Sequence, residues 1–79
     1  MKRKPIDPRA VNDMDLSIAH RIRAFRVKKD IGQVTLAESI GVTFQQVQKY
    51  ETGKNRISAS RLYLIAGALD VPIEQFFGE

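Results

Sequence analysis

The chain has 79 residues, no cysteine and a formal net charge of +4, from 13 basic and 9 acidic residues. This length suits a single domain with one modest core, and the lack of cysteine excludes a disulfide framework and a thiolate zinc site. No apolar run reaches the roughly 18 residues that a membrane span needs, so we expect a soluble, cytoplasmic protein.

The first segment, residues 1–14, carries two prolines, several charges and no apolar periodicity. We predict that it is a flexible basic N-terminal arm and that the folded domain covers residues 15–79. Most of the basic residues lie in the first 31 positions, which suits a polyanionic partner such as nucleic acid or an anionic membrane surface. An ordinary solvated basic face is the alternative.

From Leu16 onward apolar residues recur at helical spacing, and no stretch alternates as a strand would. The first predicted helix begins after a capping Asp15 or Asp13 and buries Ile18, Ile22 and Phe25. The pattern as a whole predicts an all-α, compact domain of five helices, over about 16–29, 33–40, 44–51, 59–69 and 73–77.

Local signals mark the ends of the later helices. Gly41 suits the left-handed residue that ends the second helix, and Thr43 with Gln46 has the spacing of a capping box before the third. Ser58 is predicted to cap the fourth helix, and Pro72 opens the last one, where a missing N–H costs nothing.

The third helix turns Val47 and Tyr50 inward, which leaves its other face free. That face presents four side chains, namely Phe44, Gln45, Gln48 and Lys49. Gln46 lies at the edge of the same face. Glutamine can bond to the N6/N7 edge of adenine, lysine can reach the acceptors of guanine, and phenylalanine can pack on a thymine methyl. A solvated helix face is the alternative, and Phe44 could equally form a lid over Val47.

An ordered set of motifs resembles the Cro/lambda-repressor (XRE) family of bacterial and phage helix-turn-helix proteins. The set covers about four-fifths of the chain and consists of Arg21-Ile22-Arg23, Arg26, Gln33, Leu36-Ala37, Gly41-Val42, Tyr50-Glu51-Thr52-Gly53-Lys54 and the Leu62, Ala66, Leu69, Val71 and Phe76 tail. The resemblance implies a lambda repressor-like domain that binds double-stranded DNA. It also implies a transcriptional regulator, most often a repressor, that binds a two-fold symmetric operator as a homodimer.

The resemblance also implies roles for individual residues. Gln45 and Lys49 match positions that touch bases, whereas Phe44 stands where well-known phage repressors carry a base-reading glutamine. Arg26 and Glu51 match a partly buried structural ion pair. The residues expected to contact phosphates are Gln33, Thr43, Gln46, Lys54, Asn55 and Arg56.

Several features allow a second interpretation. The exposed pair Tyr63 and Leu64 could mark a dimer face or be ordinary surface residues, and the basic arm could contact DNA or only solvent. The lone His20 is given no role. The rival function is an antitoxin-like, partner-dependent interaction module in which DNA binding is secondary.

We expect no enzyme activity, because the chain has no clustered carboxylate pair, nucleophile with a histidine partner, glycine-rich phosphate loop or metal-ligand spacing. No cofactor and no metal are predicted. Because the sequence ends soon after the fifth predicted helix, we also expect no small-molecule effector site.

Overall fold

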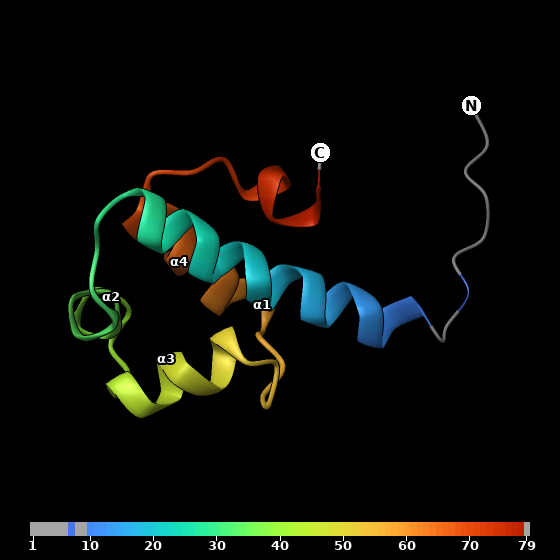
Figure 1. The fold of residues 1–79 in the computed structure, drawn as a ribbon, viewed down its shortest axis with the longest axis horizontal. Coiled ribbons are helices and arrows are strands. Elements are labelled where there is room, and N and C mark those ends of the chain that lie inside the picture. Colours follow the sequence, from blue (N-terminus) through green and yellow to red (C-terminus); the bar gives the residue numbers. More distant parts are fainter. Residues whose placement is uncertain (1–6, 8–9, 79) are drawn as a thin grey trace.

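The computed structural model describes Asp7 and residues 10–78, which form four α-helices and a short 3₁₀ helix (Figure 1). The helices are α1 (Ala10–Lys28), α2 (Gln33–Ile40), α3 (Phe44–Glu51) and α4 (Ala59–Leu69), followed by η1 (Ile73–Phe77). The described residues contain no strand. The predicted all-α fold class is therefore confirmed.

The start of α1 was predicted wrongly. The helix begins at Ala10 rather than near Leu16, so residues 10–14 belong to it and not to an arm. Asp13 and Asp15 accordingly lie inside the helix instead of capping it. These first turns project beyond the rest of the molecule (Figure 1), where they face no core and so show no apolar stripe. The remaining arm residues, 1–6, 8 and 9, lie outside the described residues.

The caps of the next three helices agree with the sequence. Gly41 ends α2 in the left-handed region at φ 74°, and its N–H donates to carbonyls of the last turn. The Thr43 hydroxyl accepts from the Gln46 N–H at 3.2 Å, and the Ser58 hydroxyl accepts from the Arg61 N–H at 3.1 Å. These caps fix where α3 and α4 begin.

The fifth helix differs from the prediction in type. Residues 73–77 form a 3₁₀ helix, in which the Gln75 N–H donates to the Pro72 carbonyl at 3.0 Å. A segment of five residues offers few i to i−4 bonds, so the tighter i to i−3 pattern is competitive there. In the described residues, the five predicted helices are therefore four α-helices and one 3₁₀ helix.

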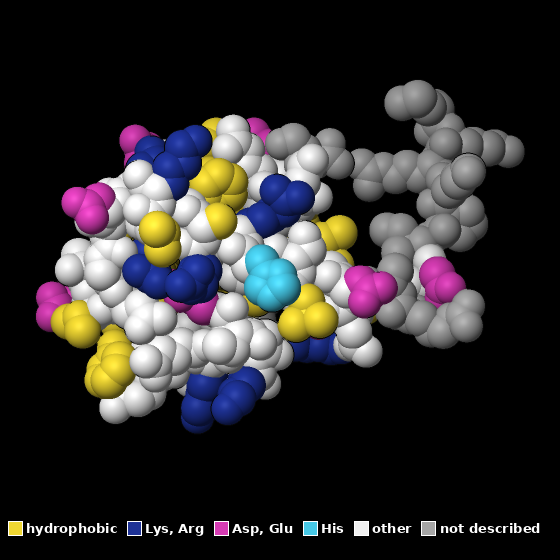
Figure 2. Space-filling view, in the orientation of Figure 1, with side chains coloured by type: hydrophobic (Ala, Val, Ile, Leu, Met, Phe, Trp, Pro, Cys, Tyr) yellow, Lys and Arg dark blue, Asp and Glu magenta, His cyan; other side chains and the backbone are white. Residues whose placement is uncertain are grey.

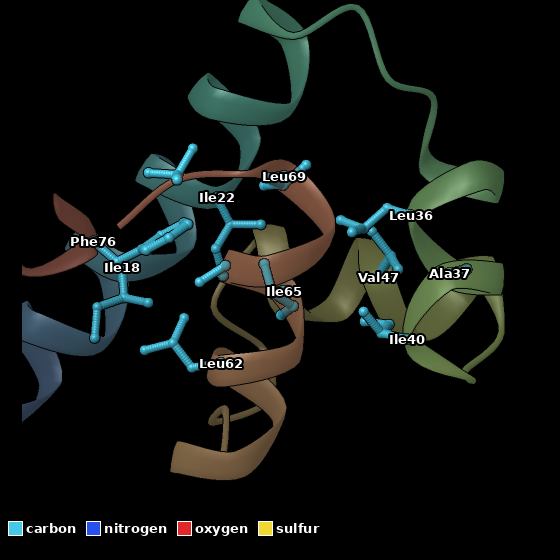
Figure 3. Packing of buried hydrophobic residues seen from close by; sticks show 12 residues of the cluster. Ile18, Ile22, Leu36, Ala37, Ile40, Val47, Leu62, Ile65, Leu69 and Phe76 are labelled. Atoms are coloured by element: carbon cyan, nitrogen blue, oxygen red, sulfur yellow. The ribbon is translucent and has the colours of Figure 1, made fainter. Parts of the chain in front are cut away.

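One hydrophobic core joins all five elements (Figure 3). Phe76 of η1 is fully buried and meets Phe25 of α1 edge to face, with ring centroids 5.2 Å apart. The other fully or nearly fully buried side chains of this core include Ile22, Leu36, Val47, Ile65 and Leu69. Burial of these residues holds α2 and α3 against α1 and α4.

The short connection between α2 and α3 is also tied down. The Val42 N–H donates to the Ala37 carbonyl at 3.0 Å, and Ala37 is itself buried in the core. A small buried residue allows two helices to approach closely at a turn. The two helices thus form a rigid helix-turn-helix unit that leaves one face of α3 uncovered.

Candidate nucleic-acid interface

The uncovered face of α3 carries the side chains that the sequence assigns to base contacts. Gln45, Gln48 and Lys49 are exposed, and Phe44 is 41% exposed at the first turn. Val47 on the opposite face is buried. Phe44 is therefore partly accessible at the surface and is not a core residue. An α-helix can enter the major groove with such a face toward the base edges.

Beneath this face lies a buried ion pair. Arg26 of α1 donates from Nε to Glu51 Oε2 at 2.6 Å and from Nη2 to Glu51 Oε1 at 2.9 Å. Arg26 is 8% exposed and Glu51 3% exposed. The hydrogen bonds to Glu51 raise the pKa of Arg26 above its ordinary value, although burial opposes this shift. Arg26 also donates from Nη1 to the Ile31 carbonyl at 2.9 Å, which ties the α1–α2 loop to the same group.

The ion pair continues outward through two glutamines. Gln33, the first residue of α2, donates from Nε2 to Glu51 Oε1 at 3.1 Å. Gln48 donates from Nε2 to Gln33 Oε1 at 3.4 Å. A chain of polar contacts therefore runs from the core to the exposed face of α3. The sequence predicts a phosphate contact for Gln33, and no local signal in it indicates the contacts with Glu51 and Gln48.

A shallow hollow lies beside α3 and brings several predicted site residues together. It is lined by Gln33, Gln45, Gln48, Lys49, Glu51, Thr52, Lys54 and also Arg23. Arg23 of α1 is exposed and adds a cation to this rim, but the predicted set of contact residues did not include it. The signal was present, since Arg23 belongs to the Arg21-Ile22-Arg23 motif.

Thr43 and Gln46 lie at the start of α3, and their roles there are partly structural. The Thr43 hydroxyl oxygen is engaged by the Gln46 N–H, while the hydroxyl proton remains available for donation. Thr43 is exposed and the Gln46 side chain is half-buried. The N-terminus of α3 therefore keeps donors that suit an anion.

The residues of the loop after α3 lie in two different places, the hollow beside α3 and a recess near the start of α1. The Lys54 N–H donates to the Lys49 carbonyl at 3.0 Å, which keeps Lys54 at the end of α3. Arg56 instead turns toward the first turns of α1, where it pairs with Asp15 at 3.0 Å and donates to Asn12 Oδ1 at 3.3 Å. Asn55 and Arg56 line a separate small recess with Asp15. Of the three loop residues, only Lys54 lines the hollow.

On the face of the molecule seen in Figure 2, the basic side chains do not form one continuous patch. Figure 2 shows Lys and Arg side chains in separate groups over one face, with one group at the lower edge, where α3 lies in Figure 1.

Among the described residues, no group of three or more His, Cys, Asp or Glu side chains could hold a metal ion. No helix in the described part is long and apolar enough to cross a membrane.

The sequence model of the helix-turn-helix family matches residues 22–76. A transcriptional regulator in the ATPase CF(0) region of Rhodospirillum rubrum is 53% identical over 73 residues, which cover 92% of this chain and 68% of that protein. An HTH-type transcriptional regulator of Sinorhizobium medicae is 46% identical over 76 residues, covering 96% of this chain. The chain spans about half the length of this second relative, since the match covers 50% of it.

Solved structures share the fold. The restriction-modification controller protein C.AhdI of Aeromonas hydrophila superposes with a TM-score of 0.76 at 29% identity, covering 82% of this chain and 97% of that one. The clp gene regulator ClgR of C. glutamicum superposes with a TM-score of 0.77, covering 92% of this chain and 86% of that one. At 20% identity, the likeness to ClgR concerns the fold alone.

Proposed function

Because the chain belongs to the Cro/C1-type helix-turn-helix family of transcriptional regulators, we propose that it binds a specific sequence in double-stranded DNA and regulates transcription from it. The observation that carries this proposal is the uncovered face of α3. Its polar side chains stand on a helix that is capped at Thr43 and held on the core by Val47. In this proposal α3 lies in the major groove.

The proposal assigns base contacts to Phe44, Gln45, Gln48 and Lys49. Phosphate contacts are assigned to residues at the starts of α2 and α3 and in the loop after α3, because their hydroxyl, amide and charged donors suit the DNA backbone. These are Gln33, Thr43, Gln46, Lys54, Asn55 and Arg56, and we add Arg23 as a candidate because it lines the same hollow as Lys54. Arg56 can reach a phosphate only after leaving Asp15 and Asn12.

The proposed mechanism is repression by a homodimer that occludes a promoter in the cytoplasm, where bacterial DNA lies. Two copies would bind half-sites about 34 Å apart, one turn of DNA. An apolar groove along α4 and η1 offers a surface for the second copy. It is lined by Tyr63 (71% exposed), Leu64 (45% exposed), Gly67, Ala68 and Ile73, among others. We assign this groove to the second copy and not to a small-molecule effector.

The first experiment is selection from a pool of randomised duplex DNA at two salt concentrations. Enrichment of a two-fold symmetric motif, with affinity that falls steeply as salt rises, is the expected result. Lack of enrichment at either salt would contradict a sequence-specific regulator. It would favour the rival function, an antitoxin-like module that depends on a protein partner.

Two classes of variant then separate base contacts from phosphate contacts. Gln45→Ala and Lys49→Ala should relax the preference at particular base pairs. Lys54→Ala should weaken binding to all sequences by a similar factor and reduce the salt dependence by about one ion. A Lys54→Ala protein that changes its preferred sequence would contradict the assigned role.

A further inference from the structure

The contacts around Gln33 carry an inference that rests on the proposed function and extends it to base selection. We propose that Gln33 orients the amide of Gln48, so that Gln48 presents its carbonyl oxygen to DNA and selects adenine. Gln33 is then a positioning residue for specificity, in addition to any phosphate that it contacts.

The orientation of the Gln33 amide follows from the chemistry of its buried partner. Glu51 is paired with Arg26 through both carboxylate oxygens, and a carboxylate accepts hydrogen bonds but cannot donate them. The Gln33 atom that lies 3.1 Å from Glu51 Oε1 must therefore be the Nε2 donor. The carbonyl oxygen of Gln33 is consequently directed away from Glu51.

The orientation of the Gln48 amide follows in turn from that of Gln33. Because Gln33 directs a carbonyl oxygen toward Gln48, the Gln48 atom that meets it at 3.4 Å must be Nε2. One N–H of that amide is then engaged, while its second N–H and its carbonyl oxygen have no partner among the described residues. The polarity of the buried ion pair is thus transmitted to an exposed side chain on α3. We call Arg26, Glu51, Gln33 and Gln48 the polar relay.

The free groups of Gln48 match one base edge better than the others. Adenine presents the N6 amino donor beside the N7 acceptor in the major groove, which fits a carbonyl oxygen beside an N–H. Guanine presents two acceptors, O6 and N7, so an oriented Gln48 would set its carbonyl oxygen against O6. A glutamine without the relay could rotate its amide and would reject guanine less strongly.

The distance of 3.4 Å between Gln48 Nε2 and Gln33 Oε1 is longer than in a typical N–H···O hydrogen bond, so in the free protein water competes with this contact. The proposed complex changes these surroundings. Closing the interface over the hollow removes competing water, and polar contacts are stronger in a lower dielectric. The relay is therefore present in the free protein and becomes stronger in the DNA complex, where base selection occurs.

The test compares the wild type with Gln33→Met, which keeps the length of the side chain but removes both amide atoms. Glu51 retains its two hydrogen bonds from Arg26 in this variant, so the fold should persist. Gln48→Ala first identifies the base pair that Gln48 reads in the selected motif. Binding is then measured to that duplex and to one carrying G·C in place of A·T at this position.

We expect the wild type to favour adenine roughly tenfold at this position, and Gln33→Met to retain only about twofold preference. The double variant Gln33→Met/Gln48→Ala should show no further loss of preference beyond Gln48→Ala. Gln45 lies on the same face but outside the relay, so it serves as the control. The base preference that is lost in Gln45→Ala should be equally large in the wild-type and Gln33→Met backgrounds.

A uniform loss of affinity in Gln33→Met, with the adenine preference unchanged, would show a phosphate contact only and overturn the inference. The inference is also overturned if Gln48→Ala changes no base preference.

Side-chain amide NMR spectra of the free protein give a measurement without DNA. The Gln48 resonances should shift in Gln33→Met while those of Gln45 stay in place, and unshifted Gln48 resonances would overturn the relay. A wild type that enriches no motif contradicts the proposed function, and the NMR result then decides the relay separately.

Discussion

At the scale of single residues, the most consequential pair is Arg26 and Glu51, because both charges are buried. Each satisfies the other through two hydrogen bonds, and Arg26 also holds the Ile31 carbonyl. The attraction within a buried ion pair adds little net stability, because both charges lose their hydration. Removing one partner is nevertheless strongly destabilising, because the remaining buried charge is left without a partner. The exposed pair between Arg56 and Asp15 lacks this property, because water can replace either partner.

Removal of either member of the buried pair should therefore be strongly destabilising. We expect Glu51→Ala to lower the free energy of unfolding by about 3–5 kcal/mol, measured by urea denaturation. The matched control is Asp15→Ala, which breaks the exposed pair and should cost less than about 1 kcal/mol. Equal losses in the two variants would contradict the difference in burial.

Two glycines provide a second residue-scale contrast. Gly53 has φ 76°, and a Cβ there would lie 2.6 Å from Leu16 Cδ2. We expect Gly53→Ala to destabilise the fold by about 1–2 kcal/mol, because the left-handed region is unfavourable for residues with a Cβ. Gly67 lies in α4, and a Cβ added there would enter open space, so Gly67→Ala should stabilise by about 0.5–1 kcal/mol. Thermal melting of both variants checks the two signs, and a stabilising Gly53→Ala would refute the strain argument.

At the scale of elements, the recognition face depends on where α3 begins. The cap at Thr43 fixes that start, and the rotation of the helix then places Val47 in the core and the polar side chains outside. A helix of eight residues has little stability of its own, so it relies on the cap and on packing.

Loss of this cap should be measurable without DNA. We expect Thr43→Ala to lower the free energy of unfolding by about 1 kcal/mol, because the Gln46 N–H loses its acceptor. Ser39→Ala serves as the control, since that hydroxyl only donates to the Thr35 carbonyl within α2 and is exposed. Urea denaturation should show no loss for Ser39→Ala, and a Thr43→Ala protein as stable as the wild type would contradict the capping role.

At the scale of the whole molecule, the proposed DNA-facing surface and the apolar groove lie on largely different elements, with α2 contributing to both. The hollow beside α3 is lined by residues of α1, α2, α3 and the following loop, whereas the groove follows α4 and η1 and includes Ser39 at the other end of α2. This separation allows a second copy to occupy the groove without covering α3.

A charge placed in the groove should therefore weaken association of two copies and leave each half-site contact intact. We expect Leu64→Glu to raise the dimer dissociation constant at least tenfold in analytical ultracentrifugation, since a buried carboxylate would lack a partner. Binding to a duplex with a single half-site should be unchanged. The control is Val27→Glu, at an exposed apolar residue of α1 that does not line the groove. If Leu64→Glu associates as the wild type does, another surface holds the dimer.

The sequence by itself determined the helices from α2 to α4 and the free face of α3. Their signals are local, since Gly41, Thr43 and Ser58 each act on atoms within a few residues along the chain. The start of α1 was not predictable in this way, because apolar periodicity reports burial and the first turns of α1 are not buried against the core. The 3₁₀ form of residues 73–77 likewise depends on the geometry of a very short segment.

The tertiary structure alone decided how the candidate site is connected. Gln33 meets Glu51 and Gln48, and Arg56 meets Asp15, across separations of 15 to 41 residues along the chain. Helical periodicity shows which side of a helix is free, but it does not show which side chain of another helix lies opposite. Contacts between helices depend on how the core sets their positions, so the polar relay and the pairing of Arg56 with Asp15 exist only in the folded molecule.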